Sequence, residues 1–441
     1  MKTITKNAPG MRDLTGSQLR KKNLIEKMAR EVALNYGFEE INTAIIELSE
    51  VFNKSLGENS DIVGKEMYIF KDEKERSLSL RPEATASIAR AIAGGLHGAN
   101  IYRLPLKLFL IGPMFRKERT QKGRYRQFYQ VNFESFEEDT EFSDAEIIAS
   151  AYDFLSSCIA KKSFKLHINY LLGGKSKEDY KKNLIKYLKK NKKFLSQTSI
   201  SRIDTNPMRI FDSKDEGDKN IMTKAPLPEL TGNDKLRFDS LKDLLHNLGI
   251  DAIYDKRLVR GLDYYRGIVF EFKTDQLGPT QDAILGGGRY AGIVKNFGGK
   301  PLDGIGWAAG IDRIIEMIEK DISKEDLYPY ATIVFSQTTS NNNYKKLAFK
   351  IAYELRKSQE LGYIQIINSN DNSISKKLKK ASKSKPYAII RVGENIEITD
   401  KKKNLYPQLG QDPIKNDDYK RIINIIKKIN LDRNVNRSET S

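Results

Sequence analysis

Residues 126–135, with the sequence RQFYQVNFES, change side-chain character at every second position. Side chains alternate between the two faces of a β-strand, so this segment predicts a long strand with one polar face and one mostly apolar face. The polar face carries a cation, an aromatic ring, two amides and a carboxylate, from Arg126, Phe128, Gln130, Asn132 and Glu134. The other face carries Gln127, Tyr129, Val131, Phe133 and Ser135. The chain around this strand must therefore form a sheet with one chemically specialised face.

A second extended segment precedes this strand and ends in a basic turn. Residues 106–119 have extended character, with Arg116 and Glu118 on one face, and residues 121–125 read QKGRY. The turn predicts a hairpin in which the two polar faces coincide. An exposed face of an antiparallel sheet is the simpler explanation. The ring of Phe128 among polar groups, and arginines where the turn could close over a phosphate, favour a ligand site.

The remaining patterns predict a protein of mixed α and β structure. In the first part of the chain we expect helices over 17–36, 47–56 and 82–93, and strands over 38–46, 67–70 and 77–80. Ser143 and Glu146 predict a capping box for a helix that ends near residue 159. Strand patterns resume at Val269.

The chain is too long for a single hydrophobic core, since it has 441 residues. Residues 170–255 are rich in lysine and in helix-forming residues, so we expect an inserted helical region within a first domain over 1–327. The YPY segment at 328–330 marks the predicted boundary. Alternating strand and helix patterns beyond it predict a small α/β domain over 328–441.

The composition of the chain limits which binding partners and which cellular location we expect. The formal net charge of +18 makes a polyanion the first partner to consider, although lysines on an ordinary solvated surface would give the same total. Cys158 is the only cysteine, so no internal disulfide forms. No signal-peptide core or membrane-spanning apolar run is present, so we expect a cytoplasmic protein without a membrane partner. The three histidines lack a second ligand at metal-binding spacing, so we expect no protein-built metal site.

Six separated motifs together resemble one known family. They are LRPEATA at 80–86, FRKERTQKGRYRQFYQVNFE at 115–134, NPMRIFDSK at 206–214, LVRGLDYYRGIVFEF at 258–272, LGGGRYAGIV at 285–294 and GIGWAAGIDR at 304–313. In this order they are similar to the motifs of the histidyl-tRNA synthetases, which are class II aminoacyl-tRNA synthetases. The resemblance covers nearly the whole chain, and the ordered set is far more specific than any single motif.

This resemblance implies which residues handle histidine. The segment RGLDYY at 260–265 resembles the family's histidine signature, in which the arginine reaches the reacting carboxylate and the α-phosphate and the tyrosines line the imidazole pocket. Arg260 and Arg116 are then the expected catalytic residues, because fixed guanidinium groups stabilise charge that builds on phosphorus oxygens. The residues expected to bind histidine are Glu83, Ala84, Thr85, Arg116, Gln130, Glu134, Arg260, Tyr264, Tyr265 and Tyr290.

The same resemblance implies an ATP site on the hairpin. Adenine would stack on Phe128 with Glu118 near the base. The phosphates would contact Arg126 and Arg313, and Arg313 resembles the arginine of the third class II motif that binds the γ-phosphate. Arg116 belongs to both the histidine site and the ATP site. Mg²⁺ is expected to arrive with the nucleotide, because it usually keeps waters and phosphate ligands.

The fold implied by the resemblance is α+β. It consists of the antiparallel sheet of class II synthetases flanked by helices, a helical insertion near the tRNA acceptor arm, and a C-terminal α/β anticodon-binding domain. The implied activity is the ATP-dependent attachment of histidine to tRNA(His) by a homodimer. Lysine-rich stretches at 181–193 and 376–385 are candidate RNA contacts or, equally, ordinary solvated helices.

Two positions depart from the family pattern, and two rival functions are open. Ala44 stands where the first class II motif generally has proline, and Ala291 stands where the family usually has aspartate. A non-catalytic paralogue that senses histidine or acts as a regulatory subunit tends to lose the RGLDYY arginine or the C-terminal domain. A plain RNA-binding protein on this scaffold has no need of Phe128 and Arg313. The chain keeps all of these features.

Overall fold

The computed structural model describes most of the chain. The described residues are 5–57, 62–96, 104–121, 123–136, 140–260, 264–278, 281–318, 329–336, 343–358, 361–367, 373–400, 404–409 and 416–438. The chain divides into two compact units, Met1–Lys320 and Asp321–Ser441, which are described separately below. Among the described residues, no helix combines the length and the apolar character needed to cross a membrane.

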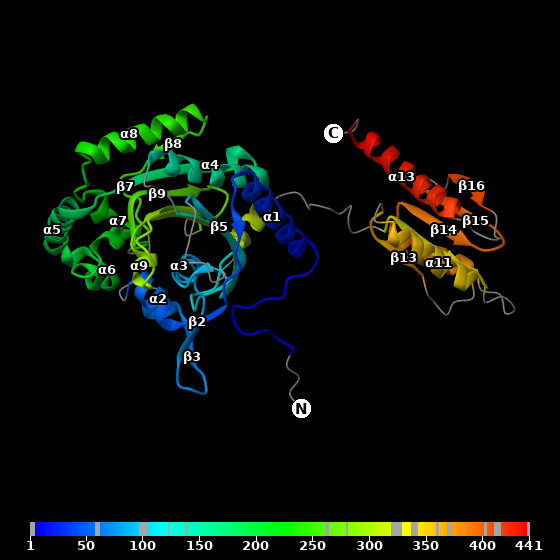
Figure 1. Ribbon diagram of the computed structural model, residues 1–441, viewed down its shortest axis with the longest axis horizontal. Helices are drawn as coiled ribbons and strands as arrows, with labels where there is room; N and C mark the ends of the chain where they lie inside the picture. Colours follow the sequence, from blue (N-terminus) through cyan, green and yellow to red (C-terminus); the bar gives the residue numbers. More distant parts are fainter. Residues whose placement is uncertain are drawn as a thin grey trace. The chain divides into compact units, whose positions relative to one another are not determined.

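An eight-stranded sheet forms the centre of the first unit, in the order β1-β5-β6-β11-β10-β9-β7-β8 (Figure 1). Neighbouring strands are antiparallel except at the two edges, where β1 runs parallel to β5 and β7 runs parallel to β8. The strands are β1 Glu39–Glu40, β5 Leu106–Phe115, β6 Gln127–Phe136, β7 Lys165–Leu171, β8 Ala252–Tyr254, β9 Tyr265–Lys273, β10 Ala283–Tyr290 and β11 Gly304–Gly310. The predicted antiparallel sheet flanked by helices is confirmed.

The predicted hairpin is also confirmed. Strand β6 covers the alternating segment and pairs antiparallel with β5, with Met114 opposite Phe128. The backbone N–H of Arg116 donates to the carbonyl of Arg126 at 2.9 Å, which extends the pairing beyond the two strands. Both segments therefore present their side chains in register.

Helices and a small second sheet surround the central sheet. The helices include α1 Gly16–Asn35, α2 Ser49–Leu56, α3 Thr85–Ala93, α4 Glu141–Cys158, α9 Ile293–Asn296 and α10 Ile311–Met317, with the π-helical turn η1 at Ile62–Glu66 and the 3₁₀ turn η3 at Lys161–Ser163. The small sheet has the order β2-β4-β3, with β2 Ile46–Leu48, β3 Tyr68–Lys71 and β4 Ser77–Leu80.

Three predicted boundaries were wrong. The strand expected over 38–46 is divided between the short strands β1 and β2. The helix expected from Pro82 begins at Thr85, because the Glu83 carboxylate accepts from the backbone N–H groups of Thr85 and Ala86 at 2.9 and 2.8 Å. Helix α4 is capped by Thr140, whose side chain accepts from the Ser143 N–H, in place of the predicted Ser143 and Glu146 box.

One face of the central sheet is packed against helix α4. The Trp307 ring of β11 stacks on Phe133 of β6 at 4.3 Å and on Phe154 of α4 at 5.4 Å. Its indole N–H donates to Ser150 of α4 at 3.0 Å. Because neighbouring residues in a strand point to opposite faces, Glu134 and Gly306 belong to the other face, where the site described below lies.

A helical region lies between β7 and β8 in the sequence and has a core of its own. Its elements are α5 Gly174–Lys190, η4 Lys192–Phe194, α6 Gln197–Arg202, η5 Pro207–Asp212, α7 Glu216–Thr223 and α8 Gly232–Asn247. Apolar residues of these elements and of the turns between them bury one another, namely Leu184, Leu188, Leu195, Ile203, Ile210, Met222 and Ala225. This region occupies the segment in which the sequence predicts a helical insertion.

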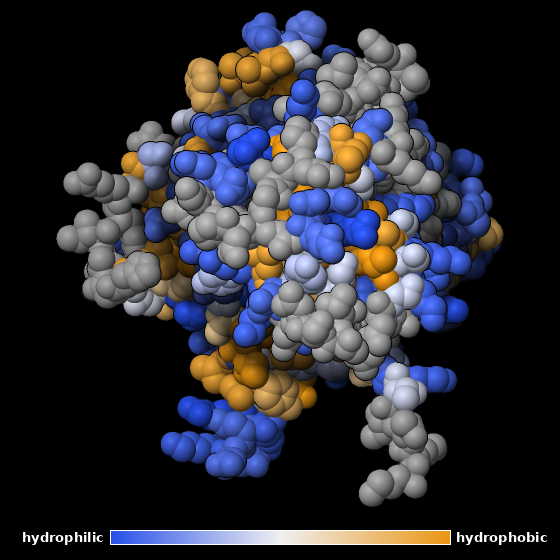
Figure 2. All heavy atoms as spheres, turned by 90° about the vertical axis from the view of Figure 1, so that its right-hand side faces the viewer, coloured by the Kyte–Doolittle hydropathy of each residue, from blue (hydrophilic) through white to orange (hydrophobic). Residues whose placement is uncertain are grey.

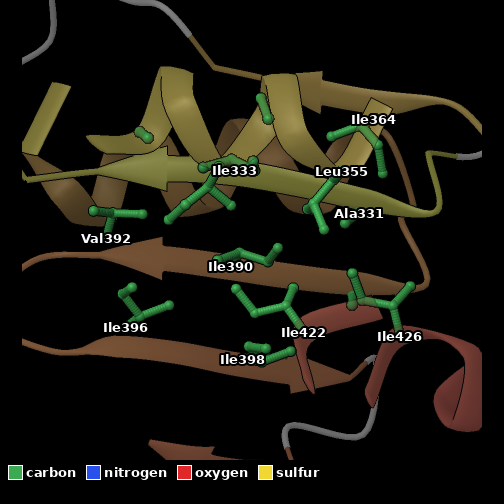
Figure 3. Packing of buried hydrophobic residues seen from close by; sticks show 14 of the residues in the cluster. Ala331, Ile333, Leu355, Ile364, Ile390, Val392, Ile396, Ile398, Ile422 and Ile426 are labelled. Atoms are coloured by element: carbon green, nitrogen blue, oxygen red, sulfur yellow. The ribbon is translucent and has the colours of Figure 1, made fainter. Parts of the chain in front are cut away.

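The described residues of the second unit form a five-stranded sheet and three helices. The strand order is β13-β12-β14-β15-β16, and β12 is parallel to both β13 and β14. The elements are β12 Ala331–Phe335, α11 Asn343–Lys357, β13 Ile364–Ile366, α12 Ile374–Lys383, β14 Ala388–Val392, β15 Ile396–Asp400, β16 Leu405–Leu409 and α13 Asn416–Ser438. Branched and aliphatic side chains from the sheet and helices meet in one core, including Ile333, Leu355, Ile390, Ile398 and Ile422 (Figure 3).

Candidate active site

A cavity of about 430 Å³ opens on the face of the central sheet that carries Glu134. Side chains reach it from the β5–β6 hairpin, the start of α3, the turn η5, the segment before β9, and strands β9 to β11. These elements are far apart in the sequence, so the antiparallel pairing of the sheet is what assembles the site. Those predicted site residues that line the cavity are Glu83, Thr85, Arg116, Glu118, Phe128, Gln130, Glu134, Arg260, Tyr264, Tyr265 and Arg313.

Glu134 lies at the centre of a buried hydrogen-bond network. The hydroxyl of Thr85 donates to its Oε1 and the hydroxyl of Tyr290 donates to its Oε2, both at 2.6 Å. Gly306 is directly opposite Glu134 in the β6–β11 pairing, and a side chain there would overlap the carboxylate. The carboxylate is thus oriented on three sides by the strands and by the start of α3.

Burial raises the pKa of both carboxyl groups at this end of the cavity. The pKa of Glu134 is raised to about 8, chiefly by burial and also by the charge of Glu83, against the two hydroxyl hydrogen bonds. Burial also raises the pKa of Glu83, opposed by its backbone hydrogen bonds at the start of α3 and by the charge of Arg116. Neither carboxyl forms an ion pair with a cation of the described residues, so the two groups are suited to a cationic ligand.

Arg260 is held by residues of strand β9. Its Nη1 forms an ion pair with Glu271 of β9, and its guanidinium lies 5.7 Å from the centre of the Tyr265 ring. Burial alone would lower the pKa of Arg260, but the charge and hydrogen bond of Glu271 together with the charges of Tyr265 and Tyr264 outweigh it, so the net shift is upward. The Nε atom of Arg260 is buried and has no hydrogen-bond partner among the described residues. A ligand that offers an acceptor would satisfy it.

The hairpin side of the cavity is strongly basic. Arg116 donates from Nε to the carbonyl of Pro82 at 2.9 Å, and its guanidinium lies 5.2 Å from the Phe128 ring centre. Burial, followed by the nearby positive charge of Arg124, lowers the pKa of Arg313. The positive charges of Arg124 and Arg313 repel each other, so this part of the cavity favours an anion. A phosphate group would compensate both charges.

The structure places three predicted residues outside the cavity lining. Ala84 is buried behind it, and Tyr290 reaches the site through its bond to Glu134. Arg126, predicted to bind ATP, instead lies along the N-terminal segment, where its Nη1 donates to the Pro9 carbonyl at 3.4 Å. Arg124, from the same basic turn, lines the cavity and pairs with Glu118.

Besides Arg124, several polar residues of the cavity were missed by the sequence analysis. Asn132 shares the polar face of β6, so the alternation already indicated its position. Arg209 and Asp212 come from the turn η5, within the NPMRIFDSK motif to which no role was assigned, and Glu271 comes from the VFEF strand pattern. Among the described residues, no group of three or more His, Cys, Asp or Glu side chains is arranged to hold a metal ion.

Comparison with known proteins identifies the family. A family model described as Histidyl-tRNA synthetase matches residues 10–314. The chain belongs to the histidyl-tRNA synthetase family. Among histidyl-tRNA synthetase relatives, the histidine–tRNA ligase of Neorickettsia sennetsu is 44% identical over 314 residues, which is 71% of this chain and 75% of that protein. The histidine–tRNA ligase of Rickettsia bellii is 38% identical over 404 residues, covering 89% and 94% of the two chains.

The fold agrees with this family membership. The crystal structure of apo S. aureus histidyl-tRNA synthetase matches with a TM-score of 0.73 at 27% sequence identity, over 93% of this chain and 98% of that one. As an aminoacyl-tRNA synthetase, a member of this family uses ATP. The resemblance of the six motifs to those of the histidyl-tRNA synthetases is therefore confirmed.

Proposed function

We propose that this chain is a histidine–tRNA ligase, which activates histidine with ATP and transfers the histidyl group to the 3′ end of tRNA(His). The observation that carries the proposal is that two buried carboxyl groups, Glu83 and Glu134, face the same cavity as two arginines, Arg116 and Arg260. Carboxylates bind an ammonium group, and guanidinium groups bind carboxylate and phosphate oxygens. The cavity is therefore suited to hold an amino acid beside a nucleotide.

Histidine binds with its ammonium group near Glu83 and Glu134 and its imidazole ring near Tyr264 and Tyr265. The two tyrosine rings are 4.7 Å apart and supply an apolar wall with placed hydroxyls, which distinguishes ring nitrogens from carbons. The buried Oε1 of Gln130 has no hydrogen-bond partner among the described residues, so it is available to accept from an N–H of histidine. The ammonium charge also favours the ionised form of Glu134.

The reaction at this site is an attack by a carboxylate oxygen of histidine on the α-phosphorus of ATP. The bond from the α-phosphorus to the oxygen that bridges the β-phosphate breaks, and pyrophosphate leaves with the electron pair. Arg260 and Arg116 stabilise the charge that develops on the phosphorus oxygens, since they are already fixed before the reaction begins. The tRNA hydroxyl then displaces AMP from the histidyl-adenylate.

ATP binds along the hairpin, with adenine on Phe128 and Glu118 near the base. The phosphates meet Arg313 and Arg124, and we assign to Arg124 the phosphate contact that the sequence analysis gave to Arg126. This choice is supported by the positions of the two side chains, because only Arg124 lines the cavity. Mg²⁺ enters on the phosphates of ATP and is part of that substrate.

The other parts of the chain contact tRNA in this proposal. The inserted region, 170–255, reaches the cavity through Arg209 and Asp212 and would meet the acceptor arm, with the lysines of α5 on the RNA backbone. The second unit would bind the anticodon, within the proposed domain 328–441. The lysines of α5 supply the positive charge for the first of these contacts.

We also propose that two copies of the chain form a homodimer through the small sheet. Apolar side chains of the β2–β4–β3 sheet and its border are exposed, with 42–50% of their surface free at Ile45, Ile46, Leu48 and Ile69. Figure 2 shows apolar atoms gathered at the level of this sheet, above the hydrophilic tip of its hairpin. A clustered apolar edge of this kind favours pairing with a second protein surface. The assembled enzyme is expected in the cytoplasm.

The test is pyrophosphate exchange measured with each amino acid in turn. Wild-type protein should exchange pyrophosphate into ATP only with histidine. Arg260→Ala should slow that exchange roughly 10²–10³-fold, the usual cost of losing one fixed oxyanion donor. A wild-type protein that binds histidine but shows no exchange would support the regulatory-subunit alternative and contradict this proposal.

A further inference from the structure

We propose that Glu271 is a positioning residue that holds Arg260 in its reactive orientation before substrates bind. The inference rests on the proposed function, because it concerns the arginine that stabilises the adenylation reaction. Glu271 lines the cavity from β9 and forms an ion pair with Nη1 of Arg260. The two residues are separated by 11 positions, and the segment between them includes the tyrosines of the histidine pocket.

The backbone beneath Arg260 is shaped for its guanidinium. Glu271 is directly opposite Gly286 in the β9–β10 pairing. A Cβ atom at Gly286 would lie 2.7 Å from the guanidinium carbon of Arg260 and would overlap its Nη1. Only glycine leaves this space open. Glu271 therefore supplies the carboxylate that pairs with Arg260, and Gly286 supplies the space that the guanidinium occupies.

The ion pair leaves part of the guanidinium available. Glu271 occupies Nη1, whereas Nε is buried without a hydrogen-bond partner among the described residues. A guanidinium presents its donors in a fixed fork, so anchoring one end determines where the others point. Glu271 therefore sets the direction in which Arg260 can donate to a phosphate or carboxylate oxygen.

A second cation supports the carboxylate of Glu271. The Nζ of Lys273, two residues further along β9, lies 3.7 Å from Oε2 of Glu271 and 3.6 Å from Asp255. Asp255 in turn lies 3.6 Å from Nδ1 of His167 on β7. Lys273 therefore holds one oxygen of Glu271 while the other oxygen anchors Nη1 of Arg260, so the carboxylate stays in place.

The experiment compares Glu271→Ala and Glu271→Gln with wild type in histidine-dependent pyrophosphate exchange. We expect Glu271→Ala to lower kcat by about 10–10²-fold with a smaller change in KM for ATP, since a misplacement of about 1 Å can cost 10²-fold. Glu271→Gln should retain more activity, because its amide oxygen can still accept from Nη1. Asp275→Asn, which removes an exposed pair with Lys165 just after the same strand, is the matched control and should leave kcat unchanged.

A double variant separates positioning from a general structural effect. If Glu271 acts through Arg260, adding Glu271→Ala to Arg260→Ala should slow exchange no further. Equal fold losses in the wild-type and Arg260→Ala backgrounds would overturn the inference, as would full activity of Glu271→Ala. Melting temperatures show whether each variant is folded, and Glu271→Gln carries the same test if the alanine variant is not. A wild-type protein without exchange would instead contradict the proposed function.

Discussion

Gly306 lies directly opposite Glu134 across strands β11 and β6, and the carboxylate of Glu134 fills the space that a side chain at Gly306 would need. The glycine at this position of the GIGWAAGIDR motif, residues 304–313, is therefore needed to make space for the carboxylate. It allows a buried carboxyl to lie flat against the neighbouring strand while Thr85 and Tyr290 orient its two oxygens. The histidine pocket depends on this one missing side chain as much as on the side chains present.

Gly306→Ala is therefore expected to raise KM for histidine by about tenfold or more and to destabilise the protein by about 1–3 kcal/mol, the usual cost of overpacking. Histidine-dependent pyrophosphate exchange and thermal unfolding would measure both effects. Gly278→Ala is the control, because a Cβ there meets no atom of the described residues within 4 Å. An unchanged KM in Gly306→Ala would show that Glu134 has room to move aside.

Glu134 should make the empty enzyme less stable as pH rises. Its folded pKa of about 8 lies above the value of about 4.3 expected for an unfolded glutamate, so the folded state binds the extra proton between these limits. Relative to Glu134→Gln, wild-type stability is fully present below pH 4 and is lost as pH rises through 8. Thermal midpoints of both proteins at pH 5, 6.5 and 8, without ligands, would reveal this trend. A constant difference between the two proteins would argue against a raised pKa.

Arg124→Ala should weaken ATP binding, whereas Arg126→Ala should not. Arg124 lines the cavity beside Arg313, and Arg126 lies against Pro9 and Gly10. Loss of a charged phosphate contact is expected to raise KM for ATP by about tenfold, equivalent to about 1.4 kcal/mol. Exchange assays at varied ATP concentration would compare the two variants. The reverse result would return the phosphate contact to Arg126.

Asp144→Asn should destabilise the first unit strongly. Asp144 is buried between Arg289 of β10, whose Nε donates to it at 2.8 Å, and Arg237 of α8, whose Nη2 donates to it at 2.8 Å. Removing its charge leaves a buried guanidinium uncompensated, which typically costs about 3–5 kcal/mol. Urea unfolding would measure the loss. Glu146→Gln on the same helix, whose pair with Lys107 is more exposed, should cost less than about 1 kcal/mol.

Ile46→Lys and Ile69→Lys should reduce homodimer formation. Both side chains are about half exposed on the small β2–β4–β3 sheet, and a lysine there would place a charge in a buried interface. Sedimentation velocity at micromolar concentration would show a shift from dimer to monomer. Leu34→Lys on α1 is a suitable control, since Leu34 is 80% exposed and lies outside this sheet. A wild-type protein that is monomeric under these conditions would contradict the proposed dimer.

Local patterns in the sequence determined the hairpin, the polar row on β6 and the family. The row from Phe128 to Glu134 was predictable because alternation within a strand is a property of the backbone alone. The ordered motifs identified the family because each is a short continuous segment. Its residues can be compared with the family pattern without knowing which segments lie beside it in space. Helix starts were less predictable, since at Thr85 the side chain of Glu83 decided the boundary.

Tertiary structure alone decided which residues meet across the cavity. Arg126 shares the alternation of β6 but comes before the strand begins, so contacts with Pro9 and Gly10, far away in sequence, direct it elsewhere. The position of Glu271 opposite Gly286, beneath Arg260, depends on the register between β9 and β10. Arg209 reaches the site only because the inserted region packs against the cavity. Strand register and the docking of distant segments arise from the packing of the whole unit, and no local pattern encodes them.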